Sequence, residues 1–372
     1  MSGVFTDDCS LFTVYYLLEL KTLIEVSIAA AIKSGILIAV LLTAFAYMTL
    51  AERKVVAWMQ VRIGPNRVGP FGFFQPVADG IKLFLKEELI PAEADRVLFI
   101  LAPIITVIPA LIILAVVPFG PAVDICLPAT LSVQFEWGAC YKVPLAVSDV
   151  NVGILFITSI ASIAVYGIVL AGWSSNNKYA MLGGLRSSAQ MVSYEISLGL
   201  AMVGPVLVAG SMSLQAITLS QEKLWNVVTQ PIGAIVFLLA VLAEVNRAPF
   251  DMPEAEQELT AGYHTEYSGM KFALFFMAEY INMVAVSAIA TSLFFGGYLG
   301  PFLNEVPSWL AGILGVIYFS AKTIFFLFCM LWIRATLPRL RYDQLMRFGW
   351  KVMLPLALAS IAITAVFMAI SG

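Results

Sequence analysis

The chain has 372 residues, of which 60% are hydrophobic and only 12% are charged. Soluble domains carry about twice this charged fraction, so lipid rather than water is expected to surround most of the surface. With one histidine, four scattered cysteines that form no C-x-x-C pair, and no glycine-rich phosphate-binding motif, the sequence argues against metal, iron–sulfur and nucleotide sites.

The first 29 residues are predicted to be an extension that lies at the membrane surface. Asp7 and Asp8 stand where a signal peptide would require basic residues. The apolar run 11–18 is too short to cross a bilayer and ends at Glu19. The remainder, 30–372, is predicted to form a single membrane domain.

Eight apolar segments follow, each near the length of about 20 residues that crosses a bilayer. Backbone polar groups find no water partners in lipid, so each segment is expected to be a helix. The predicted fold is therefore an all-α, polytopic membrane helix bundle. The fifth segment is the shortest and carries Glu244 and Arg247 near its end. The segments are 30–51, 97–118, 150–172, 188–210, 231–248, 272–296, 309–334 and 350–370.

The loops differ strongly in positive charge, which predicts how the bundle is oriented. Sixteen of the 21 lysines and arginines lie in or beside four alternate loops, which are therefore expected to face the cytoplasm or matrix. These inner loops are 52–96, 173–187, 249–271 and 335–349. Both termini are expected on the opposite side. The outer loop 119–149 contains Cys126 and Cys140, for which a disulfide and two unpaired thiols both remain open.

The loop after the first span combines a rigid turn with an amphipathic helix. Two Gly-Pro pairs in the run 62–70 break the helix and force a loop at the membrane surface. Apolar side chains then recur at helical spacing opposite Asp79, Lys82 and Lys86, which predicts a helix lying in the interface plane. These apolar residues are Phe74, Val77, Ile81, Phe84 and Leu85. The helix is either a simple surface anchor or, with its arginine-rich neighbour, the mouth of a cavity.

The loop after the fifth span is strongly acidic on a face whose other loops are basic. Pro249 and Pro253 stiffen its turn, while Glu244 and Arg247 lie in or beside hydrocarbon. Acids clustered near low dielectric can bind and release protons together. A solvated acidic loop without a function is the alternative. The acidic side chains of the loop are Asp251, Glu254, Glu256 and Glu258.

Four ionisable residues fall inside predicted spans. Glu195 and Glu279 are each about eight residues from the inner end of a span, roughly 12 Å deep; Glu244 is shallower, and Lys322 lies nearer the middle of the seventh span. A charge in hydrocarbon costs at least ~2.5 kcal/mol, so such residues usually face the bundle interior and mark proton or ion routes. Three acids outnumber one base, so ion pairing alone does not explain the set, and a proton relay is predicted.

At these residues the chain resembles a known family, the membrane subunit of respiratory complex I that forms most of its quinone cavity. The resemblance covers about residues 45 to 350, in the family's order. Two departures are Val245, where a small polar residue is expected, and the long N-terminal extension. The matching motifs are Ala51–Lys54, RIGPNRVGP at 62–70, QPVADGIKLF at 75–84, SYE at 193–195, EVNRAPFD at 244–251, EYS at 266–268, AEY at 278–280, WIR at 332–334 and PRLRYDQL at 338–345.

The resemblance implies a bundle whose tilted spans form a chamber for quinone, which is the substrate, with no redox centre or covalently bound cofactor in this chain. The iron–sulfur clusters and FMN would belong to partner subunits. The implied partners are the peripheral-arm iron–sulfur subunit, its quinone-site neighbour, the small and antiporter-like membrane subunits and the lipid membrane, but no nucleic acid.

The resemblance also implies two sets of functional residues. The residues implied to line the chamber or its neck are Arg53, Arg62, Asp79, Arg247, Phe250 and Arg334. The residues implied to couple quinone reduction to proton pumping are Asp251, Glu254, Glu256, Glu258, Glu195, Glu244 and Glu279. Lys322 is added to the coupling set because of its position inside a span. No residue is assigned a catalytic role of its own.

Three other interpretations are weighed against this one. The membrane anchor of a related hydrogenase would share the bundle and some acids, but the intact runs 62–66 and 247–251 favour the quinone-reducing branch. A free-standing ion transporter would show an internal repeat and broken helices, and a purely structural anchor has no need of surplus intramembrane acids. The expected location is the bacterial inner membrane, with the mitochondrial inner membrane as the alternative. The sequence does not select between ubiquinone and menaquinone.

Overall fold

The structure, a computed structural model, describes residues 7–126, 140–252, 262–303 and 305–371. Side chains are described for 27–123, 143–252, 262–303 and 305–370. Most of this part of the chain is helical. The helices are α1 (Asp7–Met59), α2 (Gln75–Leu85), α3 (Arg96–Ile113), α4 (Gly153–Ser174), α5 (Lys178–Ala209), α6 (Leu214–Ser220), α7 (Asn226–Thr229), α8 (Pro231–Glu244), α10 (Gly269–Phe294), α11 (Ser308–Thr336), α12 (Tyr342–Phe348) and α13 (Leu354–Ser371), with the short η1 (Pro70–Gly72), η2 (Leu114–Val116), η4 (Gly262–His264) and η5 (Gly349–Met353).

Seven segments of the described chain are long and apolar enough to cross a membrane. They coincide with seven of the eight predicted spans, so the predicted all-α polytopic bundle is confirmed. The segments are Ser27–Met59, Arg96–Val116, Gly153–Ser174, Lys178–Ala209, Gly269–Phe294, Ser308–Thr336 and Tyr342–Ile370.

The fifth predicted span, 231–248, is wrong in its length. Helix α8 has 14 residues and ends at Glu244, which gives about 21 Å of helix against a hydrocarbon thickness of about 30 Å. The helix stops because Asn246 adopts a positive φ of 55° and Pro249 follows shortly after. The acid and the arginine at its end therefore lie within the depth of the bundle rather than beyond it.

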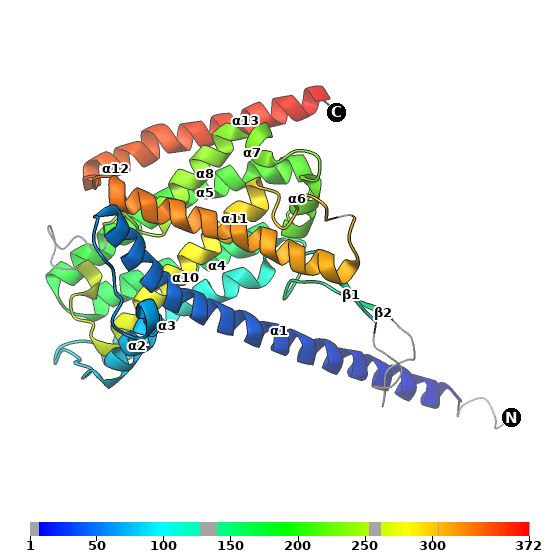
Figure 1. The fold of residues 1–372 in the computed structure, drawn as a ribbon, viewed down its shortest axis with the longest axis horizontal. Helices are drawn as coiled ribbons and strands as arrows, with labels where there is room; N and C mark the ends of the chain where they lie inside the picture. Colours follow the sequence, from blue (N-terminus) through cyan, green and yellow to red (C-terminus); the bar gives the residue numbers. More distant parts are fainter. Residues whose placement is uncertain (1–6, 127–139, 253–261, 304, 372) are drawn as a thin grey trace.

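Helix α1 is much longer than the span predicted within it. Its 53 residues correspond to about 80 Å, well over the thickness of the hydrocarbon layer. The segment 7–29, expected as an extension at the membrane surface, continues the first span in the same helix. Figure 1 shows the N-terminal part of α1 projecting past the other helices. The membrane-surface location of this segment stays a prediction.

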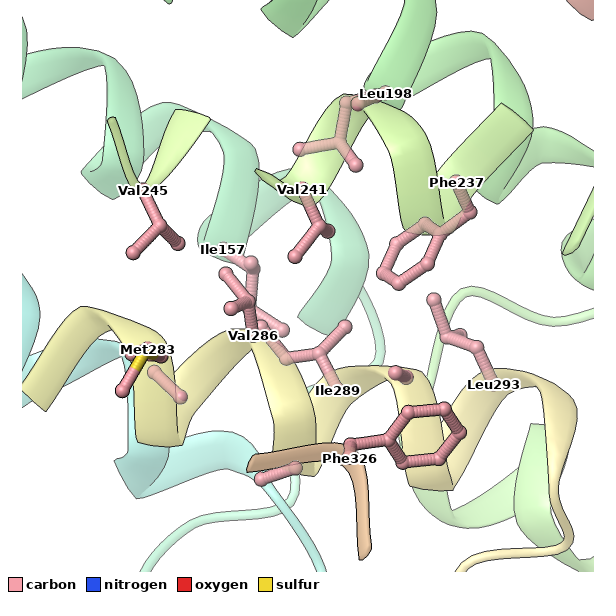
Figure 2. Packing of buried hydrophobic residues seen from close by; sticks show 14 of the residues in the cluster. Ile157, Leu198, Phe237, Val241, Val245, Met283, Val286, Ile289, Leu293 and Phe326 are labelled. Atoms are coloured by element: carbon pink, nitrogen blue, oxygen red, sulfur yellow. The ribbon is translucent and has the colours of Figure 1, made fainter. Parts of the chain in front are cut away.

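The hydrophobic core lies where α8 and α10 pack between α4, α5 and α11. Figure 2 shows this packing, with Val241 and Phe237 of α8 facing Val286, Ile289 and Leu293 of α10. All five of these side chains are buried. The apolar core therefore holds α8 and α10 against each other at the place where each also carries an acid.

Close approach of α3 and α4 depends on Gly167. A Cβ at this position would lie 2.2 Å from Thr106 Oγ1 and 3.0 Å from Ala102 O, so only glycine fits at this crossing. Small residues of this kind let membrane helices pack backbone to backbone. The contact fixes Thr106 in the wall of the cavity described below.

The sequence did not predict the short antiparallel hairpin on the outer side, formed by β1 (Val123–Cys126) and β2 (Cys140–Val143). The backbone register places Cys126 opposite Cys140, but their side chains lie outside the described residues, so pairing of the two thiols stays a prediction. Where the chain leaves the hairpin, Lys33 Nζ on α1 donates to Pro144 O at 3.0 Å and to Ala146 O at 3.3 Å. The long first helix and the outer hairpin are thereby tied together.

Candidate functional site

Four ionisable side chains from four parts of the fold form a continuous chain at the end of the bundle that is predicted to face the cytoplasm or matrix, which we call the inner end. Arg247, which follows α8, donates from Nη1 to Glu52 on α1, at 3.0 Å to Oε1 and 3.2 Å to Oε2. Arg247 also pairs with Glu279 on α10, and Arg334 on α11 pairs with Glu52. The order Arg334, Glu52, Arg247, Glu279 alternates in sign, and we call these four residues the inner ion chain.

Arg247 is the central member of the inner ion chain and is only 3% exposed. Its guanidinium lies over the ring of Tyr280, 4.4 Å from the centroid, which adds a cation–π contact. Gln190 on α5 fixes the backbone on both sides of Arg247, because its Nε2 donates to Ala243 O and to Phe250 O at 2.7 Å each. A buried charge is stable only when it is paired and held in this way.

One small cavity adjoins the inner ion chain at Glu279, and a second lies deeper in the bundle. The first has a volume of about 40 Å³ and is lined by Glu279, Glu244, Asn282 and His264 together with mostly apolar side chains. The second has a volume of about 20 Å³ and is lined by Glu195, Glu244 and Asn282 on an otherwise largely apolar wall. Ile113, Ala161, Glu244 and Asn282 line both, so the cavities are neighbours, and Glu244 is the acid that they share. A water molecule needs at least 10–15 Å³ measured in this way, so there is room for roughly three waters in the first cavity and about one in the second.

Glu195 on α5 forms the far end of this arrangement. Its carboxylate accepts a hydrogen bond from Ser162 on α4, and its side chain is partly buried. The acids Glu279, Glu244 and Glu195 thus follow one another from the inner ion chain into the bundle, separated only by the two cavities. The structure brings together the three acids that the sequence placed inside spans.

The predicted interfacial helix is present as α2, and its apolar side chains are exposed. Arg53 at the inner end of α1 pairs with Asp79 of α2 at 2.7 Å, and Lys82 reaches the same carboxylate at 3.5 Å. The pair is solvent-accessible, with half of the Arg53 side chain exposed. It ties the polar side of α2 to α1 and leaves the apolar side free to enter lipid.

The other predicted chamber residues occupy different surroundings. Arg62 lies in the exposed turn after α1, where its Nε donates to Gln60 Oε1 at 2.7 Å. Phe250 is buried, with ring centroids 5.7 Å from Tyr194 and 6.4 Å from Phe348, so it packs in the core of the inner end. Asp251 is partly buried. The remaining acids of the loop, Glu254, Glu256 and Glu258, lie outside the described residues.

Lys322 is not placed with the acids. Its ammonium donates to the carbonyls of Phe295, Gly297 and Leu299 at 2.8, 3.0 and 2.7 Å, and it lies 4.9 Å from the ring centroid of Trp225. These carbonyls follow the C-terminus of α10, about 24 Å along the helix from Glu279. Three ammonium donors meet three acceptors at the negative end of a helix dipole. A role of Lys322 in proton coupling stays a prediction that this geometry does not support.

Glu52 is the main site residue that the sequence did not single out. It lies in the motif Ala51–Lys54, but an acid at the end of a span is not distinguishable in sequence from an ordinary loop charge. Ser162 and Asn282 gave no signal, because neutral polar residues are unremarkable inside spans. His264 was noted only as the single histidine of the chain.

Fold and site together define a polytopic helical membrane protein that carries a line of buried and partly buried ionisable residues from one end of its bundle into its interior. A sequence model of the family described as NADH dehydrogenase matches residues 32–365, and the chain belongs to this family.

Curated relatives match over most of their own length. The chain is 51% identical over 325 residues to the H subunit of the NADH-quinone oxidoreductase of Protochlamydia amoebophila, covering 87% of this chain and 93% of the relative. It is 51% identical over 332 residues to an H subunit of the same enzyme from Geobacter metallireducens, covering 89% and 94%. It is 48% identical over 370 residues to an H subunit from Geobacter sulfurreducens, covering 96% and 99%. The resemblance drawn from the sequence motifs is thereby confirmed.

Proposed function

We propose that this chain is the membrane subunit of a proton-translocating NADH:quinone oxidoreductase, in which it forms the quinone chamber and transmits quinone reduction to proton pumping. The observation that carries the proposal is the continuous sequence of ionisable side chains. The inner ion chain runs from Arg334 to Glu279. Beyond Glu279, the two cavities lead on to Glu244 and then to Glu195. A line of this kind is expected where a charge change at the inner face alters the protonation of groups within the membrane.

The quinone chamber is proposed at the inner ends of α1, α2 and α11. The exposed apolar side of α2 gives a lipid-soluble tail a surface to follow, and the arginines at this end offer hydrogen-bond donors to the quinone carbonyls. Electrons would come from an iron–sulfur cluster in a peripheral-arm partner, and FMN would belong to partner subunits as well. Reduction of quinone to quinol takes up two electrons and two protons, so charge changes at this place in each turnover.

The inner ion chain is suited to respond to that change. Glu52 and Glu279 each pair with Arg247, so protonation of either carboxylate weakens one of its two ion pairs and favours the other. Counting Glu244 and Glu195, four acids face two arginines, so the arginines do not neutralise all of them. The surplus carboxylates can hold protons together and release them together. In this scheme a charge change in the chamber alters the ion pairs of Arg247. The altered pairing with Glu279 then changes the protonation of Glu244 across the first cavity.

The proposed partners and location follow from the same assignment. The inner face would bind the peripheral-arm iron–sulfur subunit and its quinone-site neighbour, and the side that carries Glu195 would lead toward the small and antiporter-like membrane subunits. The three relatives named for the comparison come from bacteria, which supports the bacterial inner membrane as the location. Their names also favour NADH as the source of electrons over the donor of a hydrogenase-type relative.

The proposal is tested with Glu244→Gln in the assembled complex, reconstituted into vesicles. We expect NADH:quinone turnover and the accompanying proton uptake to fall by about a hundredfold, while NADH oxidation by a hydrophilic artificial acceptor is unchanged. The hydrophilic acceptor takes electrons in the peripheral arm, so it reports assembly. Full retention of quinone turnover and proton uptake in Glu244→Gln would refute the proposed relay.

A further inference from the structure

His264 is the only histidine of the chain, and none of the steps above uses it. It is the last residue of η4, which stands between the acidic loop and helix α10. Its side chain is buried, with 6% exposed. It lines the first cavity together with Glu244 of α8 and Glu279 of α10. The imidazole therefore shares one cavity with two of the acids inside the bundle.

Four aromatic rings surround the imidazole. Ring centroids lie 3.8 Å from Tyr263, 5.4 Å from Phe275, 5.8 Å from Phe272 and 5.9 Å from Phe276. A cage of this composition suits a phenyl ring, and burying a polar ring in it costs free energy unless its nitrogens find partners. Within the described residues the structure gives the imidazole no hydrogen bond of its own. The cavity, which has room for roughly three waters, is the place where those partners are available.

The chemistry of a buried imidazole matches this place. Burial lowers the pKa of His264 to about 3, so the ring is neutral at physiological pH. A neutral imidazole carries one N–H donor and one acceptor nitrogen. It can therefore accept a proton on one nitrogen and release the other proton from the opposite side. Such a transfer leaves the ring neutral with its tautomer exchanged, and a second transfer or a ring flip restores the starting form.

We infer that His264 is a proton-transfer residue of the first cavity, where it passes protons between Glu279 and Glu244 through the waters that the cavity can hold. This inference rests on the proposed function, because it adds a residue to the same relay. The ionisable groups that share the cavity with it are Glu244, Glu279 and Tyr263, and the Tyr263 ring lies tilted against the imidazole. His264 acts on those acids and does not contact the quinone.

The test compares substitutions that separate the shape of the ring from its nitrogens, in the complete complex reconstituted into vesicles. His264→Phe keeps an aromatic ring in the cage but has no polar atom. His264→Gln returns one donor and one acceptor. We expect His264→Phe to lower NADH:quinone turnover coupled to proton uptake by about tenfold or more, with hydrophilic-acceptor activity unchanged. His264→Gln is expected to recover a large part of that loss.

Two controls make the outcome decisive. Phe272→Leu removes one ring of the cage and keeps the imidazole, so it should retain coupled turnover. An equal loss in Phe272→Leu and His264→Phe would mean that His264 contributes only packing, and would overturn the inference. Wild-type activity in His264→Phe would overturn it as well. If Glu244→Gln is impaired while His264→Phe is not, the inference alone fails. If neither is impaired, the proposed relay fails with it.

Discussion

The protein holds two basic side chains in opposite ways toward the two ends of the bundle, Arg247 buried and Lys322 partly buried. At the inner end, Arg247 lies between Glu52 and Glu279, whose charge changes when either takes up a proton. At the outer end, Lys322 lies among three backbone carbonyls, whose charge is fixed. Both arrangements satisfy a cation in a region of low dielectric. Only the first can change state, so burial of a charge inside a membrane is not by itself a sign of a relay, and the nature of its partners decides.

The largest expected effect is that of Arg247→Ala. The substitution leaves Glu52 and Glu279 without the cation between them, and removing one partner of a buried ion pair typically costs ~3–5 kcal/mol. We expect loss of quinone-coupled turnover together with a marked fall in the thermal stability of the complex, measured by thermal unfolding in detergent. Arg247→Lys keeps the charge but not the planar fork, so it should assemble and show partial activity. Unaltered coupling in Arg247→Ala would remove the inner ion chain from the mechanism.

Glu52→Gln tests whether the titratable partners of Arg247 matter, by changing a carboxylate rather than the arginine. Glu52 pairs with both Arg247 and Arg334, so loss of its charge leaves two arginines with fewer acids at the inner end. We expect NADH:quinone turnover to fall by about ten- to a hundredfold with assembly preserved, measured beside hydrophilic-acceptor activity in the same preparation. Glu88→Gln is the matched control, because Glu88 is itself exposed and pairs with Lys271 away from the inner ion chain, and it should have little effect on turnover.

Lys322→Met tests the other half of the comparison. Three carbonyls lose their donor, so we expect a destabilisation of ~1–3 kcal/mol, seen as a lower unfolding temperature. The ratio of protons taken up to NADH oxidised should stay at the wild-type value, because backbone carbonyls do not titrate. A changed ratio with normal assembly would instead place Lys322 in the relay, as its position inside a span first suggested.

The pH dependence of stability gives a further test, centred on His264. Its pKa is lowered by burial from 6.5 to about 3, so between these pH values the unfolded chain binds a proton that the folded chain does not. Stability contributed in this way is present above pH 6.5 and is lost as pH falls toward 3, by at most ~1.4 kcal/mol per pH unit. Unfolding temperatures at neutral and mildly acidic pH should fall less in His264→Phe than in the wild type. Identical slopes would show that folding does not lower the pKa of this imidazole.

The smallest expected effect is that of Asp79→Asn. The Arg53–Asp79 pair is solvent-accessible, and exposed pairs contribute about 0–1 kcal/mol. We therefore expect little change in unfolding temperature. If α2 guides quinone into the chamber, the apparent KM for quinone should rise modestly while the maximal rate is kept. A large loss of stability would mean that this pair holds the fold together, contrary to its exposure.

The architecture was largely predictable because lipid imposes a simple rule. Apolar runs of the right length must be helices, and seven of the predicted spans are present. The end of α8 was misplaced because apolar residues continue in sequence to Val245, whereas the turn at Asn246 depends on backbone conformation. The length of α1 was missed because Glu19 and Lys21 interrupt its apolar pattern without interrupting the helix.

The site was predictable in part. Glu195, Glu244 and Glu279 stood out because acids are rare inside spans, and the family motifs pointed to Arg247 and Arg334. Glu52 and Lys322 show the limit of such reasoning. One lies at a span end and resembles a loop charge, yet joins two arginines. The other lies inside a span and resembles a relay residue, yet binds carbonyls whose positions are set only by the turn after α10.

If the relay operates, the buried acids must change protonation when quinone is reduced. The most direct measurement is the infrared difference spectrum of the complex between its oxidised-quinone and reduced-quinone states, in the carboxyl-stretching region. We predict a carboxyl signal in the wild type that is lost or strongly altered in Glu244→Gln and kept in Lys322→Met. A signal that is the same in all three proteins, or absent in the wild type, would contradict the relay.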